Sequence, residues 1–142
     1  MKKIQNIALI AAFGLAISSS HAESIKLKAA LTGADEVPAK QVSGTGTLTA
    51  TLDTDTNTLK YHVEYAGLTG AVSAAHFHGP AVPGTNAKSQ VPVKAPFDSP
   101  IEGTATITAE QVKDLLDGKW YFNLHTGANP GGELRGQVVK DQ

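Results

Sequence analysis

Apolar and polar residues alternate along most of the chain beyond residue 22, with the two-residue period of strands that bury one face. A turn sequence rich in Asp and Asn over 53–57 joins two of these segments into a hairpin, because such side chains cap their own backbone. The alternation predicts seven short strands, over 25–31, 44–52, 58–65, 71–78, 101–108, 119–125 and 133–139.

One short helix is predicted between the fifth and sixth of these strands, over 108–118. Thr108 followed by Gln111 has the spacing of a capping box, and Gly118 stands where a helix-ending glycine is expected. Val112 and Leu115 fall on one face between them. Together the elements predict an all-β fold, an immunoglobulin-like or Greek-key β-sandwich of about seven strands with one short connecting helix.

The stretch over 79–100 breaks the alternation, because it is rich in proline and glycine. A loop of this length inside a compact domain usually has a function or shields another part of the fold. It is therefore the segment through which we would expect a protein partner to bind.

The first 22 residues have the layout of a secretory signal peptide. Lys2 and Lys3 give a positive start, an apolar run follows over 7–17, and Ser20 and Ala22 occupy the −3 and −1 positions of a cleavage site. The apolar run is shorter than the roughly 20 residues of a membrane span. We expect a signal peptide over 1–22, a single domain over 23–142, and a periplasmic or secreted protein with no membrane segment after cleavage. An uncleaved N-terminal anchor is the alternative.

Composition narrows the chemistry. The chain has no cysteine, and its one methionine is Met1, so a mature protein would offer no sulfur ligand and no thiol nucleophile. The net charge of −1 becomes −3 once Lys2 and Lys3 are removed. A weakly acidic domain lacks the basic patch that nucleic acids require.

Histidines are the candidate functional residues. In the strand over 71–78, Phe77 is expected to face the core, so His76 and His78 on either side of it face away from the core. In the strand over 119–125, Leu124 is expected to face the core, so His125 faces away from it. If the strands are neighbours in the sheet, three or four imidazoles share one patch. The alternative is a set of surface histidines hydrogen-bonded to the 79–100 loop. Beyond residue 22 the histidines are His62, His76, His78 and His125.

Four sequence blocks, over 31–38, 75–81, 123–126 and 129–137, resemble those of the CHRD domain, the chordin-type domain that also occurs in bacterial exported proteins. The resemblance covers about 25–139 and implies an all-β extracellular module. Its histidine blocks fall on His76, His78 and His125, whereas His62 lies in none of them. The His-x-His pair is also similar to the copper ligands of Cu,Zn superoxide dismutase, which is an analogy only.

Three imidazoles without sulfur suit copper(II), zinc or nickel, and copper(II) has the highest affinity among divalent ions of this series. We expect copper first and zinc second, held by His76, His78 and His125, with His62 as a further candidate, for storage, sequestration or delivery. Asn123 and Glu133 are candidates to orient the imidazoles through their free ring N–H groups. For Glu133 the alternative is an ion pair with Arg135 that closes the last strand.

Two other classes of function remain open. One is a non-catalytic interaction module in which the histidines merely fix loops. The other is a copper or zinc enzyme, which would need an acid or base beside the metal. Glu64, close to His62, is the only candidate for that role, so we assign no catalytic residue and expect binding rather than catalysis.

Overall fold

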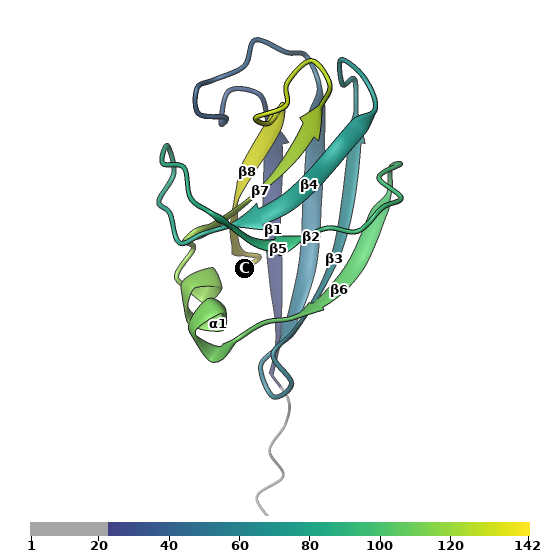
Figure 1. The fold of residues 1–142 in the computed structure, drawn as a ribbon. Coiled ribbons are helices and arrows are strands. Elements are labelled where there is room, and N and C mark those ends of the chain that lie inside the picture. The colour runs from purple at the N-terminus through teal and green to yellow at the C-terminus, as the bar shows by residue number, and fades with distance from the viewer. Residues whose placement is uncertain (1–22) are drawn as a thin grey trace, which may run out of the picture.

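A computed structural model describes residues 23–142, which fold into eight strands and one helix (Figure 1). All strand pairs are antiparallel, and the strands form one sheet in the order β5-β4-β7-β8-β1-β2-β3-β6. The elements are β1 Ser24–Thr32, β2 Thr45–Asp53, β3 Thr58–Ala66, β4 Val72–His78, β5 Ser89–Pro92, β6 Ile101–Thr106, α1 Ala109–Leu116, β7 Trp120–Thr126 and β8 Leu134–Lys140.

The predicted all-β class is confirmed, and all seven predicted strands are present. The loop over 79–100 is not entirely irregular, because β5 lies within it and pairs with β4. This strand has only four residues and ends in Pro92, so it is too short to show an alternating pattern. The predicted segment 1–22 lies outside the described residues.

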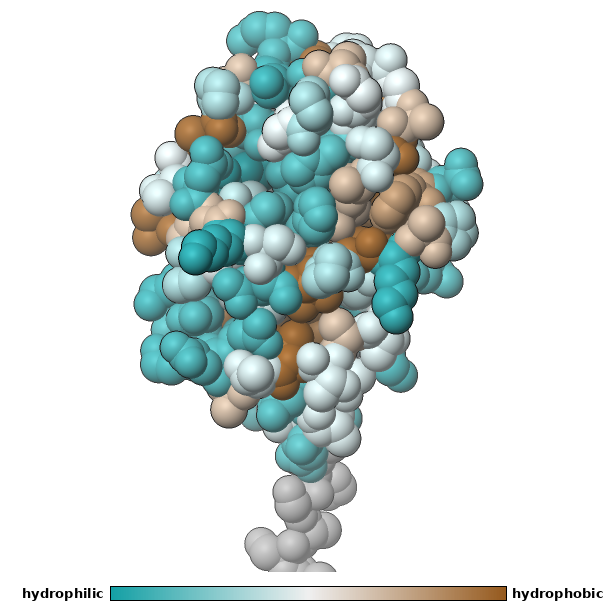
Figure 2. Space-filling view, viewed as in Figure 1, coloured by the Kyte–Doolittle hydropathy of each residue, from teal (hydrophilic) through white to brown (hydrophobic). Residues whose placement is uncertain are grey.

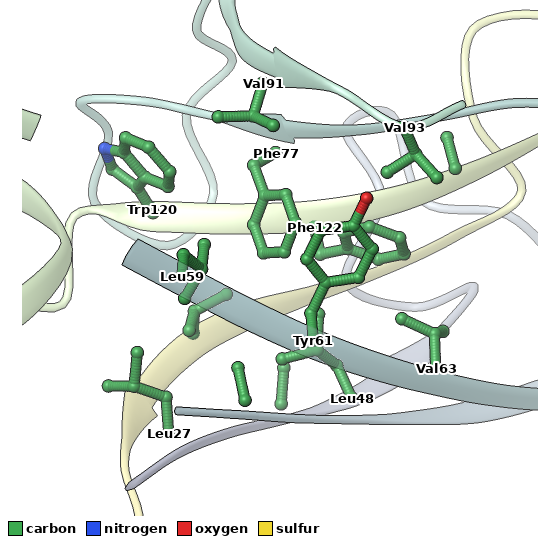
Figure 3. Packing of buried hydrophobic residues seen from close by; sticks show 14 of the residues in the cluster. Leu27, Leu48, Leu59, Tyr61, Val63, Phe77, Val91, Val93, Trp120 and Phe122 are labelled. Carbon is green, nitrogen blue, oxygen red and sulfur yellow. The ribbon is translucent and has the colours of Figure 1, made fainter. Parts of the chain in front are cut away.

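The sheet curls until it is nearly closed, and its two ends face each other across the core. Tyr61 on β3 and Phe77 on β4 are far apart in the strand order, yet their rings pack edge to face with centroids 5.2 Å apart (Figure 3). Phe122 also packs edge to face against Phe77, with ring centroids 4.9 Å apart. Full burial of each such side chain contributes roughly 1.5–3 kcal/mol. The apolar faces of the long strands are therefore buried in one core.

The free edges of the sheet are β5 and β6, and a groove of about 440 Å³ lies between the segments that carry them. From the side shown in Figure 1 the surface is mostly hydrophilic, with a few apolar residues visible near its middle (Figure 2). None of the helical structure within residues 23–142 has the length and hydropathy of a membrane-crossing segment.

The helix begins and ends as its sequence predicts. Thr108 accepts a hydrogen bond from the Gln111 amide while the Gln111 side chain accepts one from the Thr108 amide, which completes the capping box. Leu115 is buried, and Gly118 takes a φ of +71° just after the helix. The helix connects β6 to β7, the strand that pairs with β4.

Gly79 fixes the chain directly after β4. A Cβ atom at this position would lie 2.4 Å from the Trp120 ring, so only glycine allows the close approach. The Gly79 amide donates to the Lys88 carbonyl, and the Gly79 carbonyl accepts from the Gln90 side chain. The loop between β4 and β5 is thereby folded back beside the end of β4, where the histidines lie.

Candidate metal centre

Strands β4 and β7 are direct neighbours, and their register brings the histidines together. His76 lies opposite Asn123, His78 opposite Tyr121, and Ala74 opposite His125. Phe77 on β4 and Leu124 on β7 are fully buried in the core, so the histidines next to them in each strand point to the other face of the sheet, as the alternation predicts. One ligand nitrogen from each of His76, His78 and His125 lies within 4.8 Å of the other two.

The His78 ring is held in one orientation. Its Nδ1 lies 2.9 Å from the Ala87 carbonyl oxygen, and its face stacks on the Tyr121 ring at 4.8 Å and 3°. Because a carbonyl oxygen only accepts, Nδ1 carries the proton and the lone pair of the neutral ring is on Nε2. The loop between β4 and β5 therefore sets the tautomer of His78.

His125 is arranged in the same way. Its Nδ1 lies 2.9 Å from the Pro130 carbonyl oxygen, so its Nε2 also holds the lone pair of the neutral ring. That Nε2 is 3.1 Å from Nδ1 of His76. Metal–nitrogen bonds of about 2.0–2.1 Å, at angles between about 90° and 110°, place two ligand atoms about 2.9–3.4 Å apart. The contact fits either a hydrogen bond from His76 or two ligands of one ion.

Asn123 lies between the imidazoles on β7 and is only 3 % exposed. Its Oδ1 is 3.1 Å from Nε2 of His78 and 2.9 Å from Nε2 of His125. Its Nδ2 is directed to the Glu36 carboxyl at 3.4 Å. The centre of the cluster is therefore rich in lone pairs and poor in donors, which is the environment of a cation site.

The electrostatics keep the histidines available as ligands. Burial lowers the pKa of His76 below its ordinary value, and the neighbouring His125 and His78 lower it further. Burial also lowers the pKa of His78, and the contacts with Ala87 and Asn123, both of which favour the protonated ring, offset only part of this effect. Neutral imidazole is the metal-binding form, so the site favours ligation near neutral pH.

Glu36 is a functional candidate that the sequence analysis missed. It lies in the loop after β1, is 5 % exposed, and contacts Asn123. Burial raises the pKa of Glu36, and the hydrogen bond from Asn123 and the charge of Arg135 offset part of this effect. The sequence feature that could have indicated Glu36 is its position in the 31–38 block, one of the four that resemble the CHRD domain. The alternation of apolar and polar residues gives no information about a loop residue.

Arg135 supports the other side of the cluster. Its guanidinium lies 3.5 Å over the Tyr121 ring and donates to the Thr85 carbonyl and to Asn86. A stack of Arg135, Tyr121 and His78 thus fixes the loop that holds the His78 ring. Tyr121 and Asn123 lie on the same face of β7 as His125, and both are buried because the loops after β1 and β4 contact this face.

Glu133 does not have the role expected of it. It is fully buried and accepts hydrogen bonds from Thr69, Thr126 and Asn129 rather than from an imidazole. The alternative of an ion pair with Arg135 is also wrong, because Arg135 is directed to the loop after β4. The hydroxyl groups of the two threonines satisfy the carboxylate without a cation.

His62 is not brought to the cluster. It lies on β3, near the other end of the sheet, where its Nδ1 is 2.9 Å from Glu102 and its Nε2 is 3.5 Å from Glu64. The three-histidine group within residues 23–142 consists of His76, His78 and His125.

The sequence profile of the CHRD domain matches residues 27–138. The chain belongs to the CHRD domain family. The matched range contains the three histidines, Asn123, Glu36 and both loops whose carbonyls hold the rings, so the whole candidate centre lies inside the CHRD domain. Neither the curated proteins nor the solved structures contain a match to the chain.

Proposed function

We propose that this CHRD protein is exported to the periplasm or secreted, and that it binds a divalent transition metal through His76, His78 and His125. Copper is the first candidate and zinc the second. Storage, sequestration or delivery of the ion is the proposed role. The histidine cluster, which lies inside the CHRD domain, supports a metal-binding protein, and the signal-peptide pattern over 1–22 supports the location.

One observation carries the metal proposal. Backbone carbonyls occupy Nδ1–H of His78 and of His125, so both neutral rings turn the Nε2 lone pair inward. Both lone pairs then meet the acceptor Oδ1 of Asn123. Converging acceptors repel one another, and a shared cation removes the repulsion.

The donor set favours copper(II). The cluster offers imidazole nitrogen and one amide oxygen, and the chain has no cysteine to form a blue-copper site. Copper(II) exceeds zinc in the affinity order of nitrogen and oxygen ligands. An exported location would also separate the site from the thiol buffers of the cytoplasm.

Calorimetric titration with copper(II) and with zinc tests the proposal. We expect one ion per chain, and we expect His76→Ala and His125→Ala to weaken binding on the order of 100-fold or more, because each removes a ligand. His62→Ala is the matched control and should bind as the unsubstituted protein does. Equal affinity in all four proteins would remove these histidines from consideration as ligands.

The location is tested separately, by mass spectrometry of the protein recovered from fractionated cells. The expected product begins at Glu23 and is found in the periplasm or the medium. An intact chain that begins at Met1 and sediments with membranes would support the N-terminal anchor instead.

The hydrogen bonds of His78 and His125 to loop carbonyls also favour a second candidate, an interaction module in which the rings only fix the loops. In that case His78→Ala lowers the free energy of unfolding and no metal binds at micromolar concentration. If metal does bind, superoxide and ester turnover by the loaded protein distinguishes an enzyme from a carrier.

A further inference from the structure

We infer that Asn123 is itself a metal ligand, through Oδ1, so that the centre is a set of three imidazole nitrogens and one amide oxygen. The inference rests on the metal-binding function proposed above. It changes the role of Asn123 from a residue that orients the imidazoles to one that contacts the ion.

The ring N–H groups that Asn123 would need for an orienting role are already used elsewhere. To orient an imidazole, Oδ1 would have to accept from a ring N–H. The N–H of His78 already donates to Ala87, and that of His125 already donates to Pro130. Oδ1 of Asn123 therefore faces the lone-pair nitrogen of each neutral ring, where a hydrogen bond is not available.

Three of the six separations among the four candidate atoms agree with a shared ion, and the three histidine nitrogens lie within 4.8 Å of one another. Three successive contacts join the four candidate atoms: 3.1 Å from His76 Nδ1 to His125 Nε2, 2.9 Å from there to Asn123 Oδ1, and 3.1 Å from Asn123 Oδ1 to His78 Nε2. Ligand atoms bonded to one ion at about 2.0–2.1 Å, at angles of about 90–110°, are separated by about 2.9–3.4 Å. All three contacts fall in this range.

Glu36 fixes which end of the amide faces the imidazoles. The Nδ2 group of Asn123 is directed to Oε1 of Glu36, and with the Glu36 carboxyl ionised the opposite orientation would set two acceptor oxygens against each other. Gly132 makes room for this contact: a Cβ there would lie 2.2 Å from Glu36 Oε1 and 2.7 Å from Asn123 Nδ2. Its φ of +126° also requires glycine. The fold therefore holds the amide oxygen toward the cluster in advance of binding.

The test uses copper(II)-loaded protein containing asparagine labelled with ¹³C at the side-chain carboxamide carbon. In the unsubstituted protein we expect electron paramagnetic resonance with ¹⁴N couplings from imidazole and a ¹³C hyperfine coupling from the label. Asn123→Leu should lose the ¹³C coupling, shift the g and A values, and bind copper about tenfold more weakly or worse.

Asn123→Asp provides the second variant, because it keeps the size of the side chain and an oxygen donor. A bound carboxylate should shift the spectrum and tighten copper binding. Asn57→Asp is the matched control: it makes the same chemical change in the turn between β2 and β3, away from the cluster, and it should leave the spectrum unaltered.

The two proposals fail in different ways. If copper binds with imidazole couplings, but without the ¹³C coupling and with an unchanged spectrum in Asn123→Leu and Asn123→Asp, the ligand role of Asn123 is refuted and the metal function stands. If the unsubstituted protein binds neither copper nor zinc, the metal function is refuted and the ligand role falls with it.

Discussion

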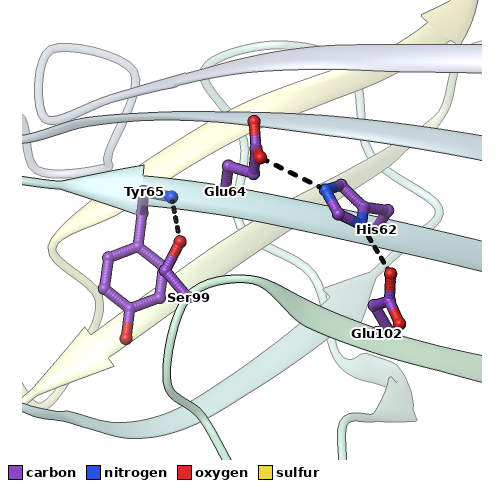
Figure 4. A network of polar contacts seen from close by, with 5 residues as sticks. All are labelled: His62, Glu64, Tyr65, Ser99 and Glu102. Carbon is purple, nitrogen blue, oxygen red and sulfur yellow. Dashed lines mark hydrogen bonds and ion pairs between the residues drawn. The ribbon is translucent and has the colours of Figure 1, made fainter.

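Two groups of histidines lie on the outer face of one sheet and have opposite chemistry. On β3, His62 is placed between two carboxylates, with Glu102 at one ring nitrogen and Glu64 at the other (Figure 4). On β4 and β7, the rings of His78 and His125 instead contact backbone carbonyls and the Asn123 amide.

The neighbours decide what each histidine can do. The hydrogen bond with Glu102 raises the pKa of His62 more than its partial burial lowers it, and Glu64 raises it further, so the imidazolium is favoured. Burial and nearby histidines lower the pKa of His76, so neutral imidazole is favoured there. The same residue type therefore favours the protonated form in one place and the neutral form, which can bind a metal, in the other.

The largest expected effect is on stabilisation by metal. A ligand at 100 times its dissociation constant stabilises the folded state by about 2.7 kcal/mol. Thermal melts with copper(II) at this excess should show that gain for the unsubstituted protein and for His62→Ala, and almost none for His125→Ala. A gain that disappears in His62→Ala would mean that the two groups do not differ in the way described.

Glu133 provides a carboxylate that belongs to neither group. Glu133→Ala should lower the free energy of unfolding by about 2 kcal/mol, because it leaves the buried Thr126 hydroxyl and its neighbours without their acceptor. Denaturant unfolding measures this loss. Copper affinity of the folded variant should stay within a few-fold of the original, and a collapse of affinity without loss of stability would return Glu133 to the metal site.

In the metal-free protein, the stability contributed by His76 and His78 should change with pH in the opposite direction to that contributed by His62. Lowered folded-state pKa values at His76 and His78 mean that the unfolded chain binds protons more readily. Their contribution to stability is complete above about pH 6.5, the unfolded value, and is lost as the pH falls through the folded-state values. For His62 the raised pKa gives the reverse: its contribution is complete below about pH 6.5 and is lost as the pH rises through the folded value.

Nuclear magnetic resonance titration of the ring signals checks these signs directly. His62 should titrate above the ordinary histidine value, and His76 and His78 below it. The same order in a His125→Ala variant would assign the lowering to burial, which is its main cause. His76 titrating above His62 would contradict the comparison.

The smallest expected effect is at Glu102. Glu102→Gln removes the main cause of the raised pKa of His62, so that pKa should fall toward its ordinary value. Copper affinity should not change, since Glu102 lies on β6 at the far end of the strand order. Ring titration and calorimetry on the one variant test both statements.

The sequence predicts the face on which each histidine lies but not the strand that lies beside it. Alternation places His76 and His78 opposite Phe77, and places His125 opposite Leu124, and both placements are confirmed. The register between β4 and β7 depends on contacts between residues about 50 positions apart, which periodicity does not encode. For the same reason, His62 could not be separated from the cluster before the strand order was known.

The contacts that the loops make with the histidines could not be predicted from the alternation of apolar and polar residues either. The carbonyls of Ala87 and Pro130 fix the tautomers, but every residue has a carbonyl and no side-chain pattern marks these two. Glu36 is buried by loop packing rather than by a strand face. The fold class could therefore be predicted, together with the face on which the three histidines lie, whereas the contacts that orient their ring nitrogens could not.

All four candidate donor side chains belong to β4 and β7, which are paired within a sheet whose core is complete without any ion. In small zinc domains the ion organises the chain, so chelators denature them. Here the paired strands and their apolar core form the scaffold, so under the proposed function uptake and release of an ion would leave the strands paired. A carrier built in this way would exchange its ion without passing through an unfolded state.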